Sequence, residues 1–417
     1  MPKGDIVIIV KGLLSRRKPD QGHGAGNPST SSSRWAILMV IYLCMLSYTL
    51  VLQSIPPVLS LIIDELGLSY HQAGVLMSLF ALPGILVSLP AGMLADRYGV
   101  KRVGIASLLF TIAGTIMVAI GQTFISLTAG RVIAGTGAIS LIVIAPQGIV
   151  QWFRNRELGV AMGIYNTALP VGVIVSLNAL PPLASQWGWR SGTWAAAALT
   201  AIALLIFCLG FRERRAEKQE TTFSVPKLGR EHVLIGLVAL SWALFNTCIV
   251  SLNTFAPDFM VGRGLSLQSA GFYTSLFVVG PLCLSPLVGY AVDRIGYPEA
   301  FMAAGGLGMA ILLPLIPAGI DYLALLMLAV GIWAALVPAP AYYLTADIAR
   351  HERLGFGFGV LSMLNNAGVF VGPQLVGLSR DVSGSYTAGF GLMALFAVLS
   401  AVVAVMLWAK RRRQETH

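Results

Sequence analysis

The sequence predicts an all-α membrane protein made of two similar six-helix bundles around a central cavity. Three observations carry this prediction. Of the 417 residues, 56% are hydrophobic and only 11% are charged, whereas soluble domains carry about 25% charged residues. Long apolar stretches recur along the whole chain, and a loop motif of the first half returns in the second. So few charges cannot cover a globular surface of this size, so most of the exterior must face lipid.

Windows of about 19 residues locate twelve apolar spans, each near the roughly 20 residues that cross a hydrocarbon core as a helix. They are 35–60, 72–95, 103–121, 124–150, 158–182, 193–211, 233–255, 269–292, 300–318, 322–346, 355–378 and 387–409. A long polar stretch divides them into six plus six. The predicted organisation is a disordered tail at 1–34, a first bundle at 35–211, a linker at 212–232, a second bundle at 233–409 and a basic tail at 410–417.

The basic residues predict the orientation. Lys and Arg gather in both tails, the linker and the even-numbered connections, whereas Arg190, Arg263 and Arg380 alone fall in odd-numbered ones. By the positive-inside rule, both termini of this multi-pass protein are cytoplasmic. We expect the bilayer to be the plasma (cell inner) membrane. The net charge of +10 is then explained by topology and anionic lipid headgroups. A nucleic-acid partner has no support, and we expect a functional monomer.

Two motifs repeat in the same order in both halves. "GMLADRYG" at 92–99 matches "GYAVDRIG" at 289–296, and "ELGVAMGI" at 157–164 matches "RLGFGFGV" at 353–360. Because six spans separate the copies, both copies lie on the same side of the membrane and the repeat is parallel. Internal duplication around a central cavity is the usual build of secondary transporters.

These motifs resemble those of the major facilitator superfamily. The loop G-x-x-x-D-R-x-G-x-K-R at 92–102 is followed in the fourth span by "RVIAGTG" at 131–137, similar to the family's R-x-x-x-G-x-G. The likeness covers residues 35–409. It implies a twelve-helix transporter in which two bundles rock about a central site in alternating access.

The resemblance also implies a gate. Asp96 would clasp the start of span 11 at Gly355, and Asp293 the start of span 5 at Gly159, when the cytoplasmic side is closed. A carboxylate docks well there because a helix N-terminus carries free N–H groups and partial positive charge. The gating motif comprises Gly92, Asp96, Arg97, Gly99, Lys101, Arg102, Gly289, Asp293 and Arg294. The alternative is that Arg97, Lys101 and Arg102 serve only as topology anchors.

Arg131 is the one clear ionisable residue inside a predicted span, and no Asp or Glu falls in the central part of any span. An unpaired buried charge must find a counterion, so Arg131 predicts an anionic solute. The alternative is that its guanidinium bonds backbone carbonyls or snorkels toward the periplasm.

Polar residues near mid-span extend the candidate site. Substrate-binding candidates besides Arg131 are Tyr48, Asn166, Asn246, Asn365 and Asn366. Each amide needs hydrogen-bond partners in an apolar medium, which a ligand can supply. The alternative for each Asn is a bond to a neighbouring helix, since such polar contacts are common in membranes.

Spans 5 and 11, equivalent in the repeat, carry residues typical of moving helices. Pro170 and Gly172 lie in span 5, and Gly372 and Pro373 in span 11. Proline removes a backbone bond and bends a helix, whereas glycine allows close helix contact. Span 5 reads "ALPVG" where family antiporters have a G-x-x-x-G-P pattern, with Leu169 in place of Gly. The segment "GIYNTALPVG" resembles instead the cyanate and nitroimidazole permease branch.

The sequence therefore predicts a secondary active transporter of a small anion, with a coupling ion as a further ligand. The alternatives are a multidrug or metabolite efflux antiporter and, from another class, a nontransporting receptor or channel. An enzyme is not expected, because no mid-span His/Asp pair, metal-ligand cluster or phosphate loop occurs. The four cysteines lie in apolar runs without C-x-x-C spacing, so neither a metal nor a cofactor is expected.

Overall fold

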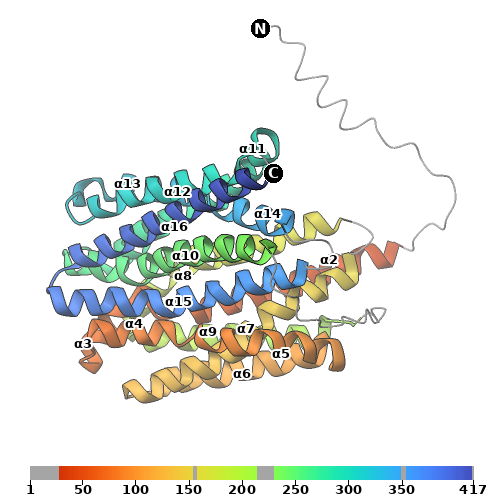
Figure 1. The fold of residues 1–417 in the computed structure, drawn as a ribbon. Helices are drawn as coiled ribbons and strands as arrows, with labels where there is room; N and C mark the ends of the chain where they lie inside the picture. The colour runs from red at the N-terminus through yellow and green to blue at the C-terminus, as the bar shows by residue number, and fades with distance from the viewer. Residues whose placement is uncertain (1–27, 154–156, 214–229, 349–353, 416–417) are drawn as a thin grey trace, which may run out of the picture.

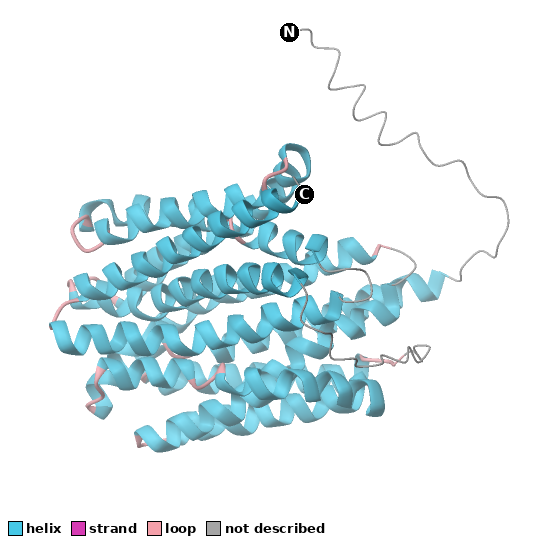
Figure 2. Cartoon of the chain, in the orientation of Figure 1, coloured by secondary structure: helices cyan, strands magenta, loops and turns pink. Residues whose placement is uncertain are grey.

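The computed structural model describes residues 28–153, 157–213, 230–348 and 354–415. Most of the predicted N-terminal tail and linker (1–27 and 214–229) lies outside these residues. Within them every regular element is a helix and no strand occurs (Figure 2). The all-α prediction is confirmed.

The first half of the chain contains α2 to α9. Their bounds are α2 Pro28–Leu52, α3 Leu59–Leu66, α4 Tyr70–Ser78, α5 Leu82–Tyr98, α6 Val100–Ile120, α7 Phe124–Phe153, α8 Leu158–Trp187 and α9 Arg190–Gly210. The second half contains α10 Arg230–Gly262, α11 Leu267–Ile295, α12 Pro298–Leu312, α13 Leu323–Ala334, α14 Pro338–Ile348, α15 Leu354–Ser383 and α16 Tyr386–Glu415. Short 3-10 turns, η1 Pro56–Val58, η2 Leu313–Leu315 and η3 Ile320–Tyr322, join some of them.

Eleven helical stretches of the described chain are long and apolar enough to cross a membrane. The predicted span 11 corresponds to α15, which has the length, 30 residues, but is not among the eleven. Its middle carries Asn365, Asn366 and Gln374. Polar residues in a helix of this length indicate contact with protein or water rather than lipid.

Helix ends differ from the predicted spans because helices continue beyond their apolar parts. The helix α2 begins at Pro28, inside the segment predicted as a tail, and α16 runs to Glu415 through the basic run at 410–413. The helix α10 extends to Gly262, seven residues past the predicted end of span 7 at 255.

The two halves form two six-helix bundles that repeat the same contacts. A Cβ atom on Gly135 of α7 would overlap the carbonyl oxygen of Phe80, and one on Gly331 of α13 would overlap that of Phe277. The members of each pair lie at equivalent positions of the repeat, 196 or 197 residues apart. The glycines thus allow the same close helix approach in both bundles.

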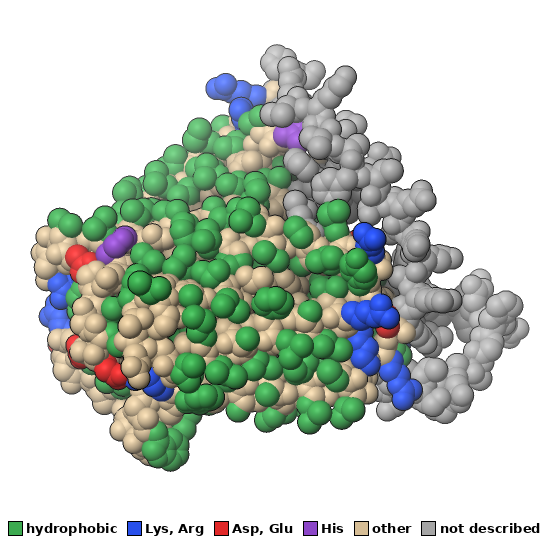
Figure 3. Space-filling model, turned by 90° about the horizontal axis from the view of Figure 1, so that it is seen from below, with side chains coloured by type: hydrophobic (Ala, Val, Ile, Leu, Met, Phe, Trp, Pro, Cys, Tyr) green, Lys and Arg blue, Asp and Glu red, His purple; other side chains and the backbone are tan. Residues whose placement is uncertain are grey.

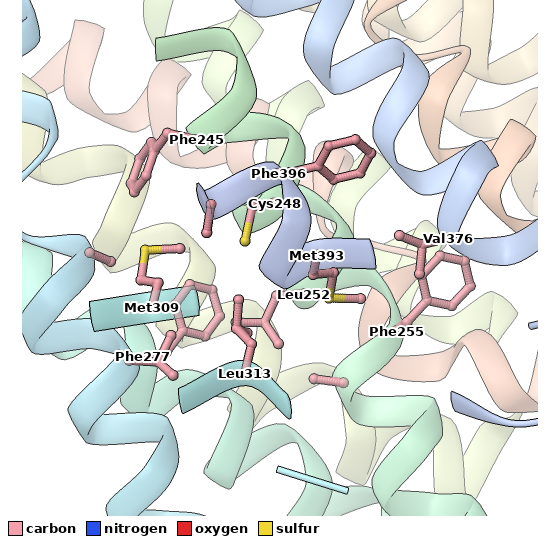
Figure 4. Close-up of a cluster of buried hydrophobic side chains, with 14 of the residues drawn as sticks. Phe245, Cys248, Leu252, Phe255, Phe277, Met309, Leu313, Val376, Met393 and Phe396 are labelled. Atoms are coloured by element: carbon pink, nitrogen blue, oxygen red, sulfur yellow. The ribbon is translucent and has the colours of Figure 1, made fainter. Parts of the chain in front are cut away.

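Side chains from several helices of the second bundle form its core (Figure 4). Cys248 and Leu252 of α10 are fully buried, and so are Met309, Leu313 and Met393 from α12, η2 and α16. The outer surface is also apolar. Hydrophobic side chains form a broad band across the middle of the molecule, and charged side chains gather at its two ends (Figure 3). This banding is what a bilayer requires of a multi-pass protein.

We call the end where α2 begins and α16 ends the terminal face, and the end carrying the α3–α4 and α15–α16 turns the opposite face (Figure 1). Ion pairs join helices of one bundle at both faces. Arg411 of α16 pairs with Glu299 and Asp347 at 2.8 Å each at the terminal face, and Arg190 pairs with Glu65 at the opposite face.

Candidate functional site

Two spans of the first bundle are broken at the same depth. The α2 helix ends at Leu52, before Pro56 and Pro57, which have no N–H to continue the ladder. The second span is broken between Ser78, the end of α4, and Leu82, the start of α5. Helix ends leave main-chain carbonyls without partners, and inside a membrane these must be satisfied by protein.

Arg131 of α7 fills this requirement. Its Nη1 donates to Val51 O at 3.0 Å and its Nη2 to Leu52 O at 3.3 Å, both at the end of α2. Its Nε donates to Leu76 O in the last turn of α4 at 3.2 Å. The side chain is 1% exposed. The bonding to backbone carbonyls, one of the two alternatives considered for this residue, is therefore present. A role in substrate binding stays a prediction.

The charge of Arg131 nevertheless has no acidic partner in the described part of the chain. Its guanidinium carbon lies 4.5 Å from the centroid of the Phe80 ring, and the ring of Tyr48 lies 6.1 Å from the same ring. Tyr48 and Arg131, predicted separately, thus contact one aromatic side chain. Tyr48 is buried.

The predicted asparagines fall into two groups. Asn246 donates to Trp242 O at 2.9 Å and Asn366 to Ser362 O at 3.0 Å, each one turn back on its own helix. Asn166 is exposed, and Asn365 Oδ1 is buried without a hydrogen-bond partner among the described residues. Neither of these two bonds joins two helices, so the amides are only partly satisfied among the described residues and their role in binding stays a prediction.

Asn366 lies at the seam between the bundles. A Cβ atom on Gly84 of α5 would be 2.8 Å from Asn366 Cγ, so the side chain of α15 packs on the bare backbone of the first bundle. A second amide contact crosses the seam where Asn253 Nδ2 of α10 donates to Gln53 Oε1 at 2.8 Å. The sequence interpretation missed this pair, although both residues are polar positions within long apolar runs.

Asp258 is a buried carboxylate that the sequence interpretation also missed. It is 6% exposed and accepts a hydrogen bond from Tyr386 Oη of α16. Because α10 extends to Gly262, Asp258 lies inside a membrane helix, although near its end. The prediction that acids are absent from the central parts of the spans was made with a helix that stopped at 255. The overlooked signal was the apolar sequence on both sides of Asp258.

Asp258 lines a cavity of about 330 Å³ at the opposite face. Both bundles contribute to it, with Ser60, Asp64 and Tyr70 from the first and Arg263, Arg380 and Tyr386 from the second. The guanidinium of Arg380 lies over the rings of Tyr70 and Tyr386, 4.8 and 5.0 Å from their centroids. The cavity therefore holds charges of both signs.

The predicted gating motif lies at the terminal face. Gly99 has φ +93° and separates α5 from α6, which explains the glycine. Val100 N, at the start of α6, donates to Glu213 Oε1 at 2.6 Å, so a carboxylate from the end of the first half caps this loop. Gly92 and Gly289 have only ordinary contacts, with a Cβ atom 3.8 and 3.9 Å from the nearest atoms.

The charged residues of the motif are accessible. Asp96, Arg97, Arg102, Asp293 and Arg294 are exposed and Lys101 is half-buried. Neither Asp96 nor Asp293 makes a hydrogen bond or ion pair to the parts of the chain that the structure describes. Their expected partners, Gly355 and Gly159, lie in first turns whose surroundings are outside those parts. Both clasps stay predictions.

The helix-flexing candidates lie in unbroken helices. Both α8 and α15 run for 30 residues through Pro170 and Pro373. A Cβ atom on Gly172 would be 2.6 Å from Thr49 Cβ, and one on Gly372 would be 2.8 Å from Ser251 Oγ. These glycines therefore bring α8 onto α2 and α15 onto α10. A bending role for the four residues stays a prediction.

The bundles touch closely in the half of the molecule toward the opposite face. A Cβ atom on Gly74 of α4 would overlap Pro373 O of α15, and one on Gly271 of α11 would overlap Leu177 O of α8. Toward the terminal face, a Cβ atom on Gly163 of α8 or Gly359 of α15 would meet no atom within 4 Å. The candidate site between the two bundles is thus closed toward the opposite face.

Two bundles with a parallel repeat and a polar seam match a known family. The sequence model of the Major Facilitator Superfamily matches residues 41–275 and 238–417. The chain belongs to the Major Facilitator Superfamily. It is therefore a transporter and not an enzyme, and the resemblance drawn from its motifs is confirmed. Among the described residues no group of three His, Cys, Asp or Glu side chains could hold a metal.

Superfamily members similar to this chain move different solutes. A nitrite extrusion protein of Bacillus subtilis is 26% identical over 372 residues, covering 86% of this chain and 92% of its own. The lysosomal dipeptide transporter MFSD1 of Danio rerio is 25% identical, covering 89% and 87%. A hexuronate transporter of Bacillus subtilis is 23% identical, covering 81% and 87%. The narrower resemblance to cyanate and nitroimidazole permeases is not tested by these relatives.

Solved structures share the superfamily fold. A mutant of the nucleoside transporter NupG aligns with a TM-score of 0.75 at 15% identity, covering 90% of this chain and 99% of that one. A bacterial homolog of the human lysosomal transporter Spinster, inward-facing and occupied, aligns with a TM-score of 0.74 at 19% identity, covering 92% and 98%.

Proposed function

We propose that this transporter moves a small anionic solute across the plasma membrane by alternating access. The observation that carries the proposal is Arg131, a fully buried guanidinium with no carboxylate partner in the described chain. Charged groups are rare inside membranes because burial is costly. A retained positive charge without an acid beside it lowers the energy of an anion nearby.

Arg131 acts on the solute through its charge rather than by direct donation. Three backbone carbonyls already occupy its Nε, Nη1 and Nη2, and Phe80 covers its face. If about 8 Å separates the guanidinium from the solute, and the effective dielectric constant is about 20, the positive charge still attracts an anion by about 2 kcal/mol. The contacts to the solute would come from Tyr48, Asn166, Asn246, Asn365 and Asn366, whose amide and hydroxyl groups can donate to an anion.

The solutes of similar proteins support an anion. Two of the relatives are named for nitrite and hexuronate, which are both anions. Asn365 and the other amides of the seam add neutral polar groups, which suit a solute that leaves its water on entering.

The orientation follows from charge. We assign the terminal face, where α2 begins and α16 ends, to the cytoplasm because the basic connections gather there. With the opposite face closed, the structure then corresponds to a state that opens inward. A coupling ion accompanies the solute, and the functional unit is a monomer. The basic residues face anionic lipid headgroups and not nucleic acid.

The test compares Arg131→Lys, Arg131→Gln and Arg263→Gln in proteoliposomes. Arg263 is a matched control, because it also lies over an aromatic ring and donates to a carbonyl, Pro317 O at 3.2 Å, but at the opposite face. We expect Arg131→Gln to lower uptake of nitrite and small carboxylates by about 30-fold, the factor that corresponds to about 2 kcal/mol. Arg131→Lys, which keeps the charge, retains selectivity for anions over neutral analogues, and Arg263→Gln transports normally.

Thermal stabilisation by ligand separates binding from folding. An anion at 100 times its dissociation constant adds about 2.7 kcal/mol to the folded state. If folded Arg131→Gln protein were stabilised by the same anions as the wild type, or transported them unchanged, the anion assignment would be wrong.

An aromatic series favours one second candidate, efflux of lipophilic compounds. The ring of Trp242 lies 5.5 Å from that of Tyr342, which lies 6.2 Å from Phe358, and the last two side chains are 49% and 37% exposed. Such a surface could stack flat cations or neutral rings. Stabilisation by lipophilic cations alone, indifferent to Arg131→Lys and Arg131→Gln, would support this candidate over an anion carrier.

A further inference from the structure

Asp381, near the end of α15, bonds the first turn of a helix in the other bundle. Its Oδ1 accepts from Tyr70 N at 2.9 Å and its Oδ2 from His71 N at 2.7 Å, at the start of α4. These N–H groups have no partner inside their own helix. A carboxylate at this position also meets the positive end of the helix dipole. One side chain thus closes two charge-assisted bonds between the bundles.

The local sequence makes α4 ready for this acid. Ser69 is the N-cap and accepts from Gln72 N at 3.1 Å, while Gln72 Oε1 accepts from Ser69 N at 3.0 Å. This capping box satisfies the helix's third N–H and the N-cap's own N–H. The capping box does not satisfy the N–H groups of Tyr70 and His71, and Asp381 accepts a hydrogen bond from each of them.

Backbone packing holds the two helices at this distance. A Cβ atom on Gly377 of α15 would overlap Tyr70 O, and one on Gly74 would overlap Pro373 O. His71 Nδ1 lies 3.3 Å from Gln374 O. The helices α4 and α15 lie side by side along this stretch (Figure 1), so the bonds of Asp381 exist only while the opposite face is closed.

The equivalent interface of the repeat closes without a charge. Ser185 of α8 stands 196 residues before Asp381, and Ser266, the N-cap of α11, stands 197 residues after Ser69. There Gln268 Nε2 donates to Ser185 Oγ at 3.0 Å. The backbone contact is preserved, since Gly271 and Leu177 repeat Gly74 and Pro373. The two equivalent interfaces therefore share the same backbone packing. The carboxylate bond is found at the α4–α15 interface, whereas a serine stands at the equivalent position of α8.

We propose that Asp381 is the gating residue of the opposite face, whose bond to the α4 N-terminus must break each time the transporter opens outward. The inference rests on the proposed alternating access. It places a carboxylate-to-helix bond at the opposite-face end of the second and eleventh spans. The sequence predicts that Asp96 joins the same two spans at the terminal face. The two bonds would then form in alternation, each stabilising one state.

The experiment measures the distance between two spin labels by double electron–electron resonance. Labels at Gln122→Cys and Tyr322→Cys report on the opposite face, because these exposed residues lie in the α6–α7 connection of the first bundle and in η3 of the second. The four native cysteines are replaced first. The matched control is Asp321→Asn, an exposed acid of the same face with no hydrogen bond to other described residues.

We expect Asp381→Asn and Asp381→Ala to raise the population with the longer distance several-fold, and Asp381→Glu to restore part of the short-distance population. Asp321→Asn leaves the distribution unchanged. In transport, the Asp381 variants should change the KM for solute added at the opposite face. Their protein yield and melting temperature should stay close to those of the wild type. A merely structural role would lower the melting temperature without shifting the populations.

Unchanged distances in both Asp381→Asn and Asp381→Ala would overturn the proposal. This failure is distinguishable from failure of the anion assignment, because the distance measurement needs no solute. Anion transport could persist with an unaltered distribution, or be absent while the distribution shifts.

Discussion

Gly163 of α8 and Gly359 of α15 occupy equivalent positions of the two halves, and both face open space. A Cβ atom on either glycine would meet nothing within 4 Å. A glycine in mid-helix costs about 0.5–1 kcal/mol relative to alanine. Nothing packs on these two glycines while the terminal face is open, so we infer that both are contact surfaces when the terminal face closes.

Gly163→Leu and Gly359→Leu should therefore separate stability from turnover. We expect the free energy of unfolding to stay unchanged or to rise by up to about 1 kcal/mol, which leaves the melting temperature equal or higher. The transport rate should fall by about tenfold or more. Gly391→Leu is the control, because Gly391 also has open space around it and its helix α16 packs on α10, α12 and α15 of its own bundle. A normal rate for both variants would show that the terminal face closes without these surfaces.

At the opposite face the same kind of substitution should act in the reverse direction. Gly74→Ala places a methyl group against Pro373 O, and Gly271→Ala places one against Leu177 O. Overpacking of this kind costs about 1–3 kcal/mol, and the bundles can relieve it by parting. Labels at 122 and 322 should report a longer distance in both variants, whereas Gly163→Ala leaves it short. Retention of the short distance in Gly74→Ala and Gly271→Ala would contradict this.

The bonds of Arg131 predict a stability effect that is independent of any solute. Arg131→Met removes the donors to Val51 O, Leu52 O and Leu76 O. Val51 O keeps the bond from Ser54 Oγ at 2.9 Å, so Leu52 O and Leu76 O are the carbonyls that lose their donor. A buried polar group left unsatisfied costs about 1–3 kcal/mol, so a loss of about 2–6 kcal/mol is expected in thermal unfolding in detergent. Arg131→Lys should lose less, since an ammonium retains up to three donors. Arg263→Met, at the exposed end of α10, should change stability by less than about 1 kcal/mol.

Asp258 and Tyr386 predict a pH-dependent effect. Tyr386→Phe removes the hydroxyl that donates to the buried carboxylate. A hydrogen bond to a charged group is worth about 1.5–3 kcal/mol, so the variant should lose this amount where Asp258 is ionised and less in acid, where the carboxyl is protonated. Asp64, Tyr70, Arg263 and Arg380 also face this cavity. A stability difference independent of pH, or its persistence in the Asp258→Asn background, would contradict this account.

The fold was predictable from sequence because hydropathy and the repeated loop motif report directly on membrane spans and their parallel duplication. Helix ends were less predictable, since α10 continues past its apolar part. This difference hid Asp258, which is buried by tertiary packing and not by the lipid-facing pattern that hydropathy measures.

The surroundings of Arg131 could not be predicted for another reason. Its partners are carbonyls freed by breaks in two other helices, and main-chain groups carry no sequence signal. The break after Leu52 was visible in "SIPP" at 54–57, but the one after Ser78 was not, because "SLFALPG" at 78–84 reads as a continuous apolar helix. Asp381 was overlooked because exposed acids are common and its partners are again backbone groups.

The fixed position of Arg131 has an electrical consequence. Moving one elementary charge through the membrane potential involves about 2.3 kcal/mol per 100 mV. Because Arg131 is tied to carbonyls of its own bundle, its charge keeps nearly one depth while the bundles rock and takes up little of that energy. The transient current that accompanies rocking of the solute-free transporter should therefore contain little charge movement from Arg131, and a voltage-clamp recording after a voltage step measures that current.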